Sequence, residues 1–203
     1  MKRLIIATRN AHKTDEIRAM LGDLFDEVTD LNAFPEIPSP VEDGVSFAAN
    51  ARIKSESASE ALGGAMVMSD DSGLEVDALG GAPGVFSARY AGEGASDADN
   101  RAKLLAALAK SGARGKARAG RFRCVLSIAK DGAEIAAFDG AVEGILANEE
   151  KGGGGFGYDP LFIPEGHCET FGQLPAEVKN GLSHRARALA QARVHLEQVS
   201  AVA

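Results

Sequence analysis

Two adjacent carboxylates after an apolar run are the residues of this chain best suited to chemistry. The apolar run 65–68 (AMVM) is followed by the polar stretch 69–74 (SDDSGL). The run is too short for a helix and predicts a buried strand that ends at the carboxylates. Side chains alternate along a strand, so only one of Asp70 and Asp71 should face a given pocket. That carboxylate could bind Mg²⁺ or activate water, or it could simply end the strand as an Asx-turn.

A second polar stretch lies near the N-terminus. Residues 4–7 predict a buried strand, residues 8–13 (TRNAHK) a polar turn, and the apolar residues of 17–24 recur at helical spacing. The backbone N–H groups and dipole of such a helix start can receive a phosphate, and the ammonium of Lys13 would add positive charge. The turn lacks the glycines of a P-loop. A capped helix start with a solvated lysine is the structural alternative.

An acidic turn, 42–44 (EDG), precedes a second predicted helix over residues 45–62. The helix dipole favours a carboxylate at Glu42 whatever its function, and Glu42 can equally be a metal ligand. Lys54 lies inside this helix. Residues 26–41 contain three prolines and predict a connection that runs over the surface.

A glycine-rich stretch, 151–160 (KGGGGFGYDP), has the glycine content of a flexible linker. However, Phe156, Tyr158 and Asp159 within it, and the strand-like run 161–163 after it, are not linker composition. Glycines let the backbone approach a ligand closely, and an aromatic ring beside them can stack on a planar base. The carboxylate could accept a hydrogen bond from a ring N–H.

Three basic residues, Lys179, His184 and Arg185, cluster around the start of the last predicted helix. A single histidine at a helix start is usually a cap or a surface residue. The cluster as a whole favours an anion site or a row of hydrogen-bond donors.

The middle of the chain predicts antiparallel strands. Residues 122–128 and 134–146 read as strands, and Asp131-Gly132 between them is a hairpin turn signal. Because strand–helix units come first and a hairpin follows, a mixed α/β sheet fits better than a parallel one.

Composition sets the remaining limits. The chain has 203 residues, 45% of them hydrophobic and 25% charged, which suits one globular domain or two small lobes. Its net charge of −7 argues against nucleic-acid binding, so the basic residues of 110–123 are interpreted as a flexible, solvated connection. No apolar run approaches the roughly 20 residues that span a bilayer, and two cysteines suggest no disulfide framework. A cytoplasmic protein without a membrane partner is expected.

In their order along the chain, these motifs resemble the inosine triphosphate pyrophosphatase family, which hydrolyses dITP, ITP and XTP. Each motif is weak alone, but the ordered set spans nearly the whole chain and is specific. The matching segments are 8–13, 42–51, 70–74, 80–84, 87–92, 154–160 and 183–185.

The resemblance implies an α/β fold in which residues 1–203 form a single nucleoside-triphosphate pyrophosphatase domain. That domain would have a mixed sheet, an elongated two-lobed shape, a central substrate cleft and usually a homodimeric assembly. The implied reaction is Mg²⁺-dependent cleavage of non-standard purine nucleoside triphosphates to the monophosphate and pyrophosphate. It would keep such nucleotides out of DNA and RNA.

The resemblance also implies roles for individual residues. Asp71 would be the general base and a metal ligand, and Glu42 a second metal ligand. The residues implied to hold the triphosphate are Thr8, Arg9, Asn10, Ala11, His12, Lys13, Lys54 and Ser72. The residues implied to hold the base are Phe156, Gly157, Tyr158, Asp159, Lys179, His184 and Arg185.

A reason for purine selectivity follows from these roles. Donors around His184 and Arg185 would pair with the six-keto oxygen of hypoxanthine or xanthine and be left unpaired against the amino group of adenine. Guanine also carries a six-keto group, so its exclusion rests on the resemblance alone.

Two positions depart from the family pattern: Arg9 often corresponds to glycine, and Ala49 to a glutamate. Arg9 could add charge to the triphosphate site or point to solvent, and the missing carboxylate at Ala49 could weaken metal binding. Three other functions stay open: a hydrolase of other nucleoside triphosphates, a non-catalytic nucleotide-binding module, and a nucleic-acid-binding protein.

Overall fold

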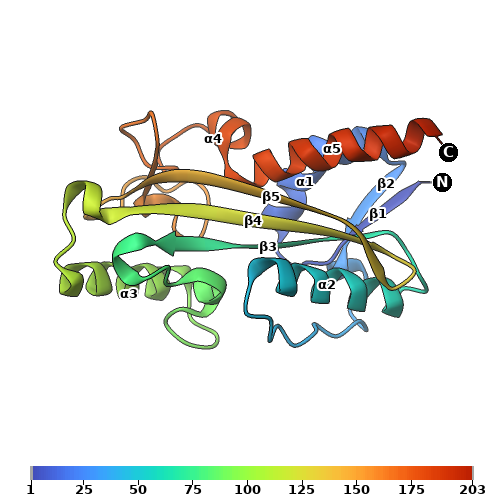
Figure 1. The fold of residues 1–203 in the computed structure, drawn as a ribbon, viewed down its shortest axis with the longest axis horizontal. Helices are drawn as coiled ribbons and strands as arrows, with labels where there is room; N and C mark the ends of the chain where they lie inside the picture. The colour runs from blue at the N-terminus through green and yellow to red at the C-terminus, as the bar shows by residue number, and fades with distance from the viewer. Residues whose placement is uncertain (1, 203) are drawn as a thin grey trace. The chain divides into compact units, whose positions relative to one another are not determined.

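A computed structural model of the chain describes residues 2–202, with side chains described for residues 2–199. Over this range five α-helices and six strands alternate with short 3₁₀ turns (Figure 1). The strands are β1 (Arg3–Ile6), β2 (Glu27–Asp30), β3 (Val67–Val76), β4 (Ala119–Lys130), β5 (Ala133–Leu146) and β6 (Phe162–Pro164). The helices are α1 (Ala11–Leu21), α2 (Phe47–Ala61), α3 (Asp97–Ser111), α4 (Ala176–Leu182) and α5 (His184–Val202).

The six strands form one sheet in the order β2-β1-β3-β4-β5-β6. Strand β1 pairs in parallel with β2 and β3, whereas β6 pairs antiparallel to β5. The predicted turn Asp131-Gly132 joins β4 to β5, and both of its residues have the positive φ angles of a two-residue hairpin loop. The predicted mixed α/β fold is therefore confirmed.

The chain divides into two compact units. Unit 1 holds the described residues up to Asp71, then Cys124–Gly140, then those from Arg185 onward. Unit 2 holds Ser72–Arg123 and Ala141–His184. Each unit has its own hydrophobic core.

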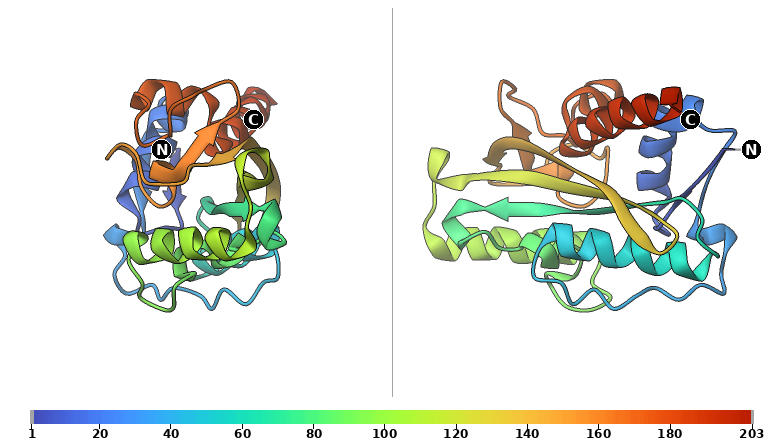
Figure 2. Two further views of the ribbon diagram at one scale, coloured as in Figure 1. Left: turned by 90° about the vertical axis from the view of Figure 1, so that its left-hand side faces the viewer. Right: turned by 45° about the vertical axis from the view of Figure 1, so that its right-hand side comes forward.

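In unit 1, helices cover both faces of the strands (Figures 1 and 2). On one face, Leu4 and Ile6 of β1 pack with α1 and α5, and on the other face Ile5 packs with α2. This arrangement follows from the alternation of side chains along a buried strand. The first core consists of Leu4, Ile6, Ile17, Leu21, Phe25, Met68, Cys124, Leu126, Ile128, Ala188, Leu189, Ala192 and Leu196.

In unit 2, α3 packs on the end of β3, the start of β4 and the end of β5. The N-terminus of α3 is closed by a capping box in which the side chains of Ser96 and Asp99 each accept a hydrogen bond from the other's backbone N–H. The core of this unit consists of Leu74, Val76, Leu104, Leu108, Phe122, Val142, Leu146, Tyr158, Leu161, Phe162 and Phe171.

Three sequence expectations need correction. Strand β3 does not end at the carboxylates but continues through Asp70 and Asp71 to Val76. Strand β2 lies within 26–41, where only a surface connection was expected. The segment 110–123 is ordered, because the buried Arg118 side chain donates to the carbonyls of Leu146 and Ala147. Within residues 2–202, no helix is long and apolar enough to cross a membrane.

Candidate active site

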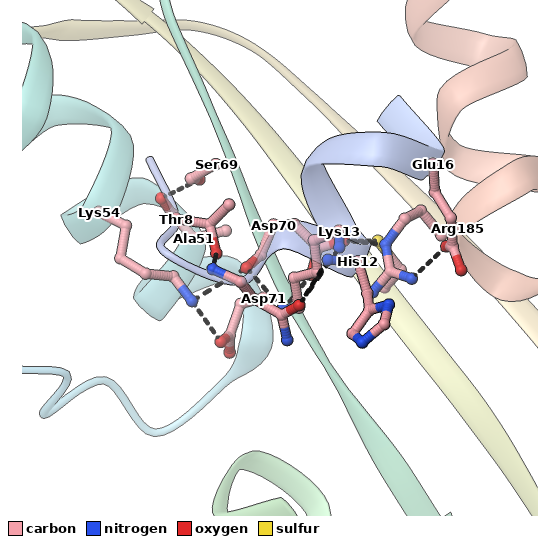
Figure 3. Close-up of polar contacts among 12 residues, drawn as sticks. Thr8, His12, Lys13, Glu16, Ala51, Lys54, Ser69, Asp70, Asp71 and Arg185 are labelled. Carbon is pink, nitrogen blue, oxygen red and sulfur yellow. Dashed lines mark hydrogen bonds and ion pairs between the residues drawn. The ribbon is translucent and has the colours of Figure 1, made fainter. Parts of the chain in front are cut away.

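The central carboxylates lie on opposite faces of β3, as alternation predicts (Figure 3). Ser69 donates to the carbonyl of Ala51, and Asp71 accepts from Lys54, so both side chains point toward α2. Asp70 points the other way and pairs with Lys13 and Arg185, of α1 and α5. Because these polar side chains are bonded, the strand can run on through them in the interior. The Asx-turn alternative for Asp70 is wrong.

Asp70 is the centre of a buried charge network. Its Oδ1 accepts from Lys13 Nζ at 2.5 Å, and its Oδ2 accepts from Arg185 Nε at 2.7 Å and from Cys124 Sγ at 3.2 Å. Arg185 Nη1 donates in addition to Glu16 Oε2 at 2.5 Å. The Asp70 carboxylate has no exposed surface.

Asp71 lies in a second cluster on the α2 side of β3. Lys54 Nζ is 2.6 Å from Asp71 Oδ1 and 3.4 Å from Glu42 Oε2. It also donates to the backbone carbonyl of Asp70 at 3.0 Å, and Lys13 Nζ donates to the same oxygen at 3.4 Å. Two ammonium groups therefore converge on one carbonyl of β3, next to two carboxylates.

Burial and charge shift the pKa values of the two carboxylates in opposite directions. Burial would raise the pKa of Asp70, but the charges of Arg185 and Lys13 hold it well below its ordinary value. Burial raises the pKa of Asp71, and the nearby Lys54 only partly offsets this. Burial would lower the pKa of Lys54, but Asp71 and the neighbouring acids raise it. Lys54 is therefore charged at neutral pH.

The Asp71 cluster fits Mg²⁺ as the resemblance implies. Asp71 Oδ2 is buried and has no hydrogen-bond partner among the described residues, and Glu42 supplies a second carboxylate. Mg²⁺ prefers oxygen ligands and takes few from the protein, leaving other positions to water and phosphate oxygens. Within residues 2–199, no group of three or more His, Cys, Asp or Glu side chains is placed to hold a metal ion. Ala49 adds no ligand.

The N-terminal turn caps α1. Asn10 Oδ1 accepts from the backbone N–H groups of His12 and Lys13, and Thr8 Oγ1 accepts from the N–H of Asn10. The Arg9 guanidinium donates to backbone carbonyls of Leu31, Phe34 and Ile37, and it therefore ties down the segment that follows β2. Arg9 is exposed, but its guanidinium is bonded to these carbonyls. A contact of this residue with a triphosphate stays a prediction.

The glycine-rich stretch is folded in unit 2. Lys179 Nζ lies 4.7 Å from the centre of the half-buried Phe156 ring and donates to Asp159 Oδ2 at 2.7 Å. The same carboxylate oxygen accepts from the Phe156 N–H at 2.9 Å. Residues 156–159 and Lys179 are thus brought together, and the flexible-linker alternative is wrong.

The other aromatic residue of this stretch has a structural role. Tyr158 is buried in the core of unit 2, and its hydroxyl donates to the carbonyl of Ser87 at 2.8 Å. Gly157 beside it is held by Asp97 and Arg101 of α3. The His184 ring stacks on Phe122 with centroids 4.9 Å apart.

The predicted site residues fall in both units. Unit 1 contains residues 8–13, Glu42, Lys54, Asp71 and Arg185, and unit 2 contains Ser72, 156–159, Lys179 and His184.

Sequence reasoning missed Glu16 and Cys124 beside Asp70, and Asp97 and Arg101 beside Gly157. The one signal in the sequence was spacing: Glu16 follows Lys13 by one helical turn, and Arg101 follows Asp97 by one helical turn.

The chain is similar to known proteins over nearly its whole length. The model of the Ham1 family matches residues 4–195. A dITP/XTP pyrophosphatase of Geobacter sulfurreducens is 44% identical, with 97% of each chain covered. One from Geobacillus kaustophilus is 45% identical, covering 98% of this chain and 96% of its own. The solved structure of a HAM1 protein from Coxiella burnetii matches with a TM-score of 0.88 and 36% identity, covering 98% of this chain and all of the other.

Proposed function

The chain belongs to the Ham1 family, and we propose that it hydrolyses non-standard purine nucleoside triphosphates (dITP, ITP and XTP). The products are the nucleoside monophosphate and pyrophosphate, and the role is to clear the nucleotide pool before such nucleotides enter DNA or RNA. The names of the two bacterial relatives, both dITP/XTP pyrophosphatases at 44% and 45% identity, support this substrate class.

The observation that carries the proposal is the buried, unbonded Oδ2 of Asp71 beside a cluster of charged groups. A buried carboxylate oxygen without a partner costs stability and is retained where it has a function. Here it lies beside Glu42, Lys54 and Lys13, which together offer negative ligands for a cation and positive charge for phosphate. This combination suits hydrolysis of a metal–nucleotide complex.

The proposed reaction needs positioning and charge neutralisation rather than a covalent intermediate. Glu42 and Asp71 would hold Mg²⁺, which when bound neutralises phosphate charge and makes water more acidic. Lys13 and Lys54 bind the triphosphate oxygens. Asp71 Oδ2 takes the proton of the attacking water, the water oxygen bonds to the α-phosphorus, and the bridging oxygen leaves with pyrophosphate.

Base recognition is proposed for the cluster in unit 2. The purine would stack on Phe156, and Lys179 has further N–H groups besides the one that it donates to Asp159. An ammonium donor pairs with a six-keto oxygen but not with an amino group, which favours hypoxanthine and xanthine over adenine. His184 and Arg185 remain proposed base ligands. Arg185 would share its five N–H groups between the base, Asp70 and Glu16.

Further properties are proposed from the resemblance: residues 1–203 as one domain of two lobes with a substrate cleft, a homodimer, and location in the cytoplasm. The proposal includes no nucleic-acid or membrane partner. The net charge of −7 supports the absence of a nucleic-acid partner.

Pyrophosphate release from ITP, XTP, dITP, ATP and GTP, with Mg²⁺ and with EDTA, tests the proposed function. Rapid release from the first three, little from ATP or GTP and none with EDTA is the expected result. Equal rates with all five would identify a hydrolase of ordinary nucleotides. Nucleotide binding without release would instead identify a non-catalytic module, and either outcome would contradict the proposal.

Replacing Glu42 with Gln should raise the Mg²⁺ concentration needed for half-maximal rate by at least about tenfold, because the cation loses a charged ligand. Asp43→Asn is the matched control, since it removes the same charge from the exposed neighbouring residue. A Mg²⁺ titration of the ITP reaction measures both variants. An unchanged half-maximal concentration in Glu42→Gln would remove Glu42 from the metal site.

A further inference from the structure

The peptide groups on both sides of Gly157 are held by side chains of one helix. The Gly157 N–H donates to Asp97 Oδ2 at 2.7 Å, and the Gly157 carbonyl accepts from Arg101 Nη1 at 2.9 Å. Both contacts lie within unit 2, and both involve a charged side chain, which makes a hydrogen bond stronger than a neutral pair does. Side chains of α3 therefore bond both the N–H and the carbonyl of Gly157. We call this pair of contacts the clamp.

The helix that supplies the clamp is itself well anchored. Asp97 and Arg101 are four residues apart on α3 and therefore share a face. The capping box of Ser96 and Asp99 closes the first turn, and Leu104 and Leu108 are fully buried in the core. Arg101 is further oriented by Glu150, whose Oε2 lies 3.0 Å from its Nε. The clamp therefore joins the loop to a well-anchored helix.

Other contacts also hold this loop: the Phe156 N–H donates to Asp159 Oδ2, and the Gly154 N–H donates to the Gly172 carbonyl, each at 2.9 Å. Gly152, Gly155 and Gly157 have positive φ angles, and no side chain of residues 152–155 can pack. Such glycines lower the cost of the turn but leave many other conformations open. Gly157 directly follows Phe156, so the bond from the Gly157 N–H to Asp97 constrains the ψ angle of Phe156, whose ring lies 4.7 Å from Lys179 Nζ.

We propose that Asp97 and Arg101 are positioning residues that set base affinity by holding Gly157, and through it the Phe156 ring, in the orientation that receives the purine. The inference rests on the proposed function, because it takes Phe156 as the stacking surface. Neither side chain need touch the nucleotide. Loosening the clamp should weaken binding of the base while phosphate binding stays as it was, since the phosphate ligands Lys13 and Lys54 belong to unit 1.

Asp97→Ala and Arg101→Ala test the inference. Loss of one charge-assisted hydrogen bond should raise the KM for ITP by about tenfold in each variant, with kcat changed by less than about twofold. Inhibition by inorganic tripolyphosphate, which has no base, should be unaltered. Asp97→Asn keeps an acceptor oxygen for the Gly157 N–H and should restore most of the affinity.

Asp99→Ala is the matched control from the same helical turn. It removes the carboxylate of the capping box, so it should lower the melting temperature without changing the KM for ITP. A purely structural role for Asp97 would give the same pattern as this control. An unchanged KM in both Asp97→Ala and Arg101→Ala, or an equal loss of tripolyphosphate inhibition, would overturn the inference.

Direct binding separates this inference from the proposed function. If the wild type left ITP intact, the proposed function would fail, but calorimetric binding of ITP in EDTA could still be compared between the wild type and Asp97→Ala. Weaker ITP binding with unchanged tripolyphosphate binding would support the clamp, and equal ITP binding would contradict it.

Discussion

Replacing Asp71 with Asn should reduce pyrophosphate release from ITP by about 10²- to 10⁴-fold, the usual contribution of a general base. The amide keeps the shape of the side chain but cannot take the proton of the attacking water. Measurement of kcat with saturating Mg²⁺ and ITP gives the effect. A variant with a nearly normal rate would show that Asp71 is not the base.

The same substitution should leave the fold at least as stable as the wild type. Burial raises the pKa of Asp71 in the folded protein, so the folded state binds this proton more tightly than the unfolded state does. Above that pKa, the ionised carboxylate therefore costs stability. A neutral amide removes this cost, and the Lys54 ammonium keeps Glu42 and the Asp70 carbonyl as partners. Thermal unfolding in metal-free buffer at pH 7 should give an unchanged or higher midpoint. A much lower midpoint would mean that lost activity reflects misfolding.

Replacing the adjacent Asp70 with Asn should have the opposite effect on stability. The carboxylate is fully buried between Lys13 and Arg185, and removing one partner of such a buried ion pair costs about 3–5 kcal/mol. The positive charge of Arg185 would then be balanced only in part, by Glu16. Urea unfolding at pH 7 measures the loss. Asp71→Asn is the matched control, because the same change is made one residue away on the other face of β3.

The stability that Asp70→Asn loses depends on pH in a direction set by the pKa of Asp70. The pKa of Asp70 lies well below its ordinary value in the folded protein because Arg185 and Lys13 outweigh burial. Its stabilising contribution is then complete above the unfolded pKa of about 3.9 and is lost only as the pH falls below that value toward the folded pKa. The difference in free energy of unfolding between Asp70→Asn and the wild type should stay constant from about pH 5 to 8. Over this range Asp70 is ionised in both the folded and the unfolded state. A difference below about 1 kcal/mol at pH 7 would contradict the assigned network.

Most elements that carry the site could be predicted from local pattern. The apolar run 4–7 predicted the first strand, and the polar turn 8–13 predicted the start of α1. Asp131-Gly132 predicted the hairpin. These signals could be recognised because each acts over a few residues. The apolar alternation after Met68 was harder to see. Leu74 and Val76 are buried in β3, but the four polar residues before them interrupt the run that marks a strand.

The sequence by itself determined the family resemblance, the mixed α/β class and the carboxylate–lysine chemistry, since these depend on residue types and their order. Only the tertiary structure decided which side chains meet. Asp70 pairs with Arg185, 115 residues away, and Gly157 bonds to Asp97 at a separation of 60 residues. Contacts over such distances leave no periodic signal in the chain, because they arise when separately formed elements pack together. The difference in role between Asp70 and Asp71 is likewise set by the face of β3 on which each side chain lies.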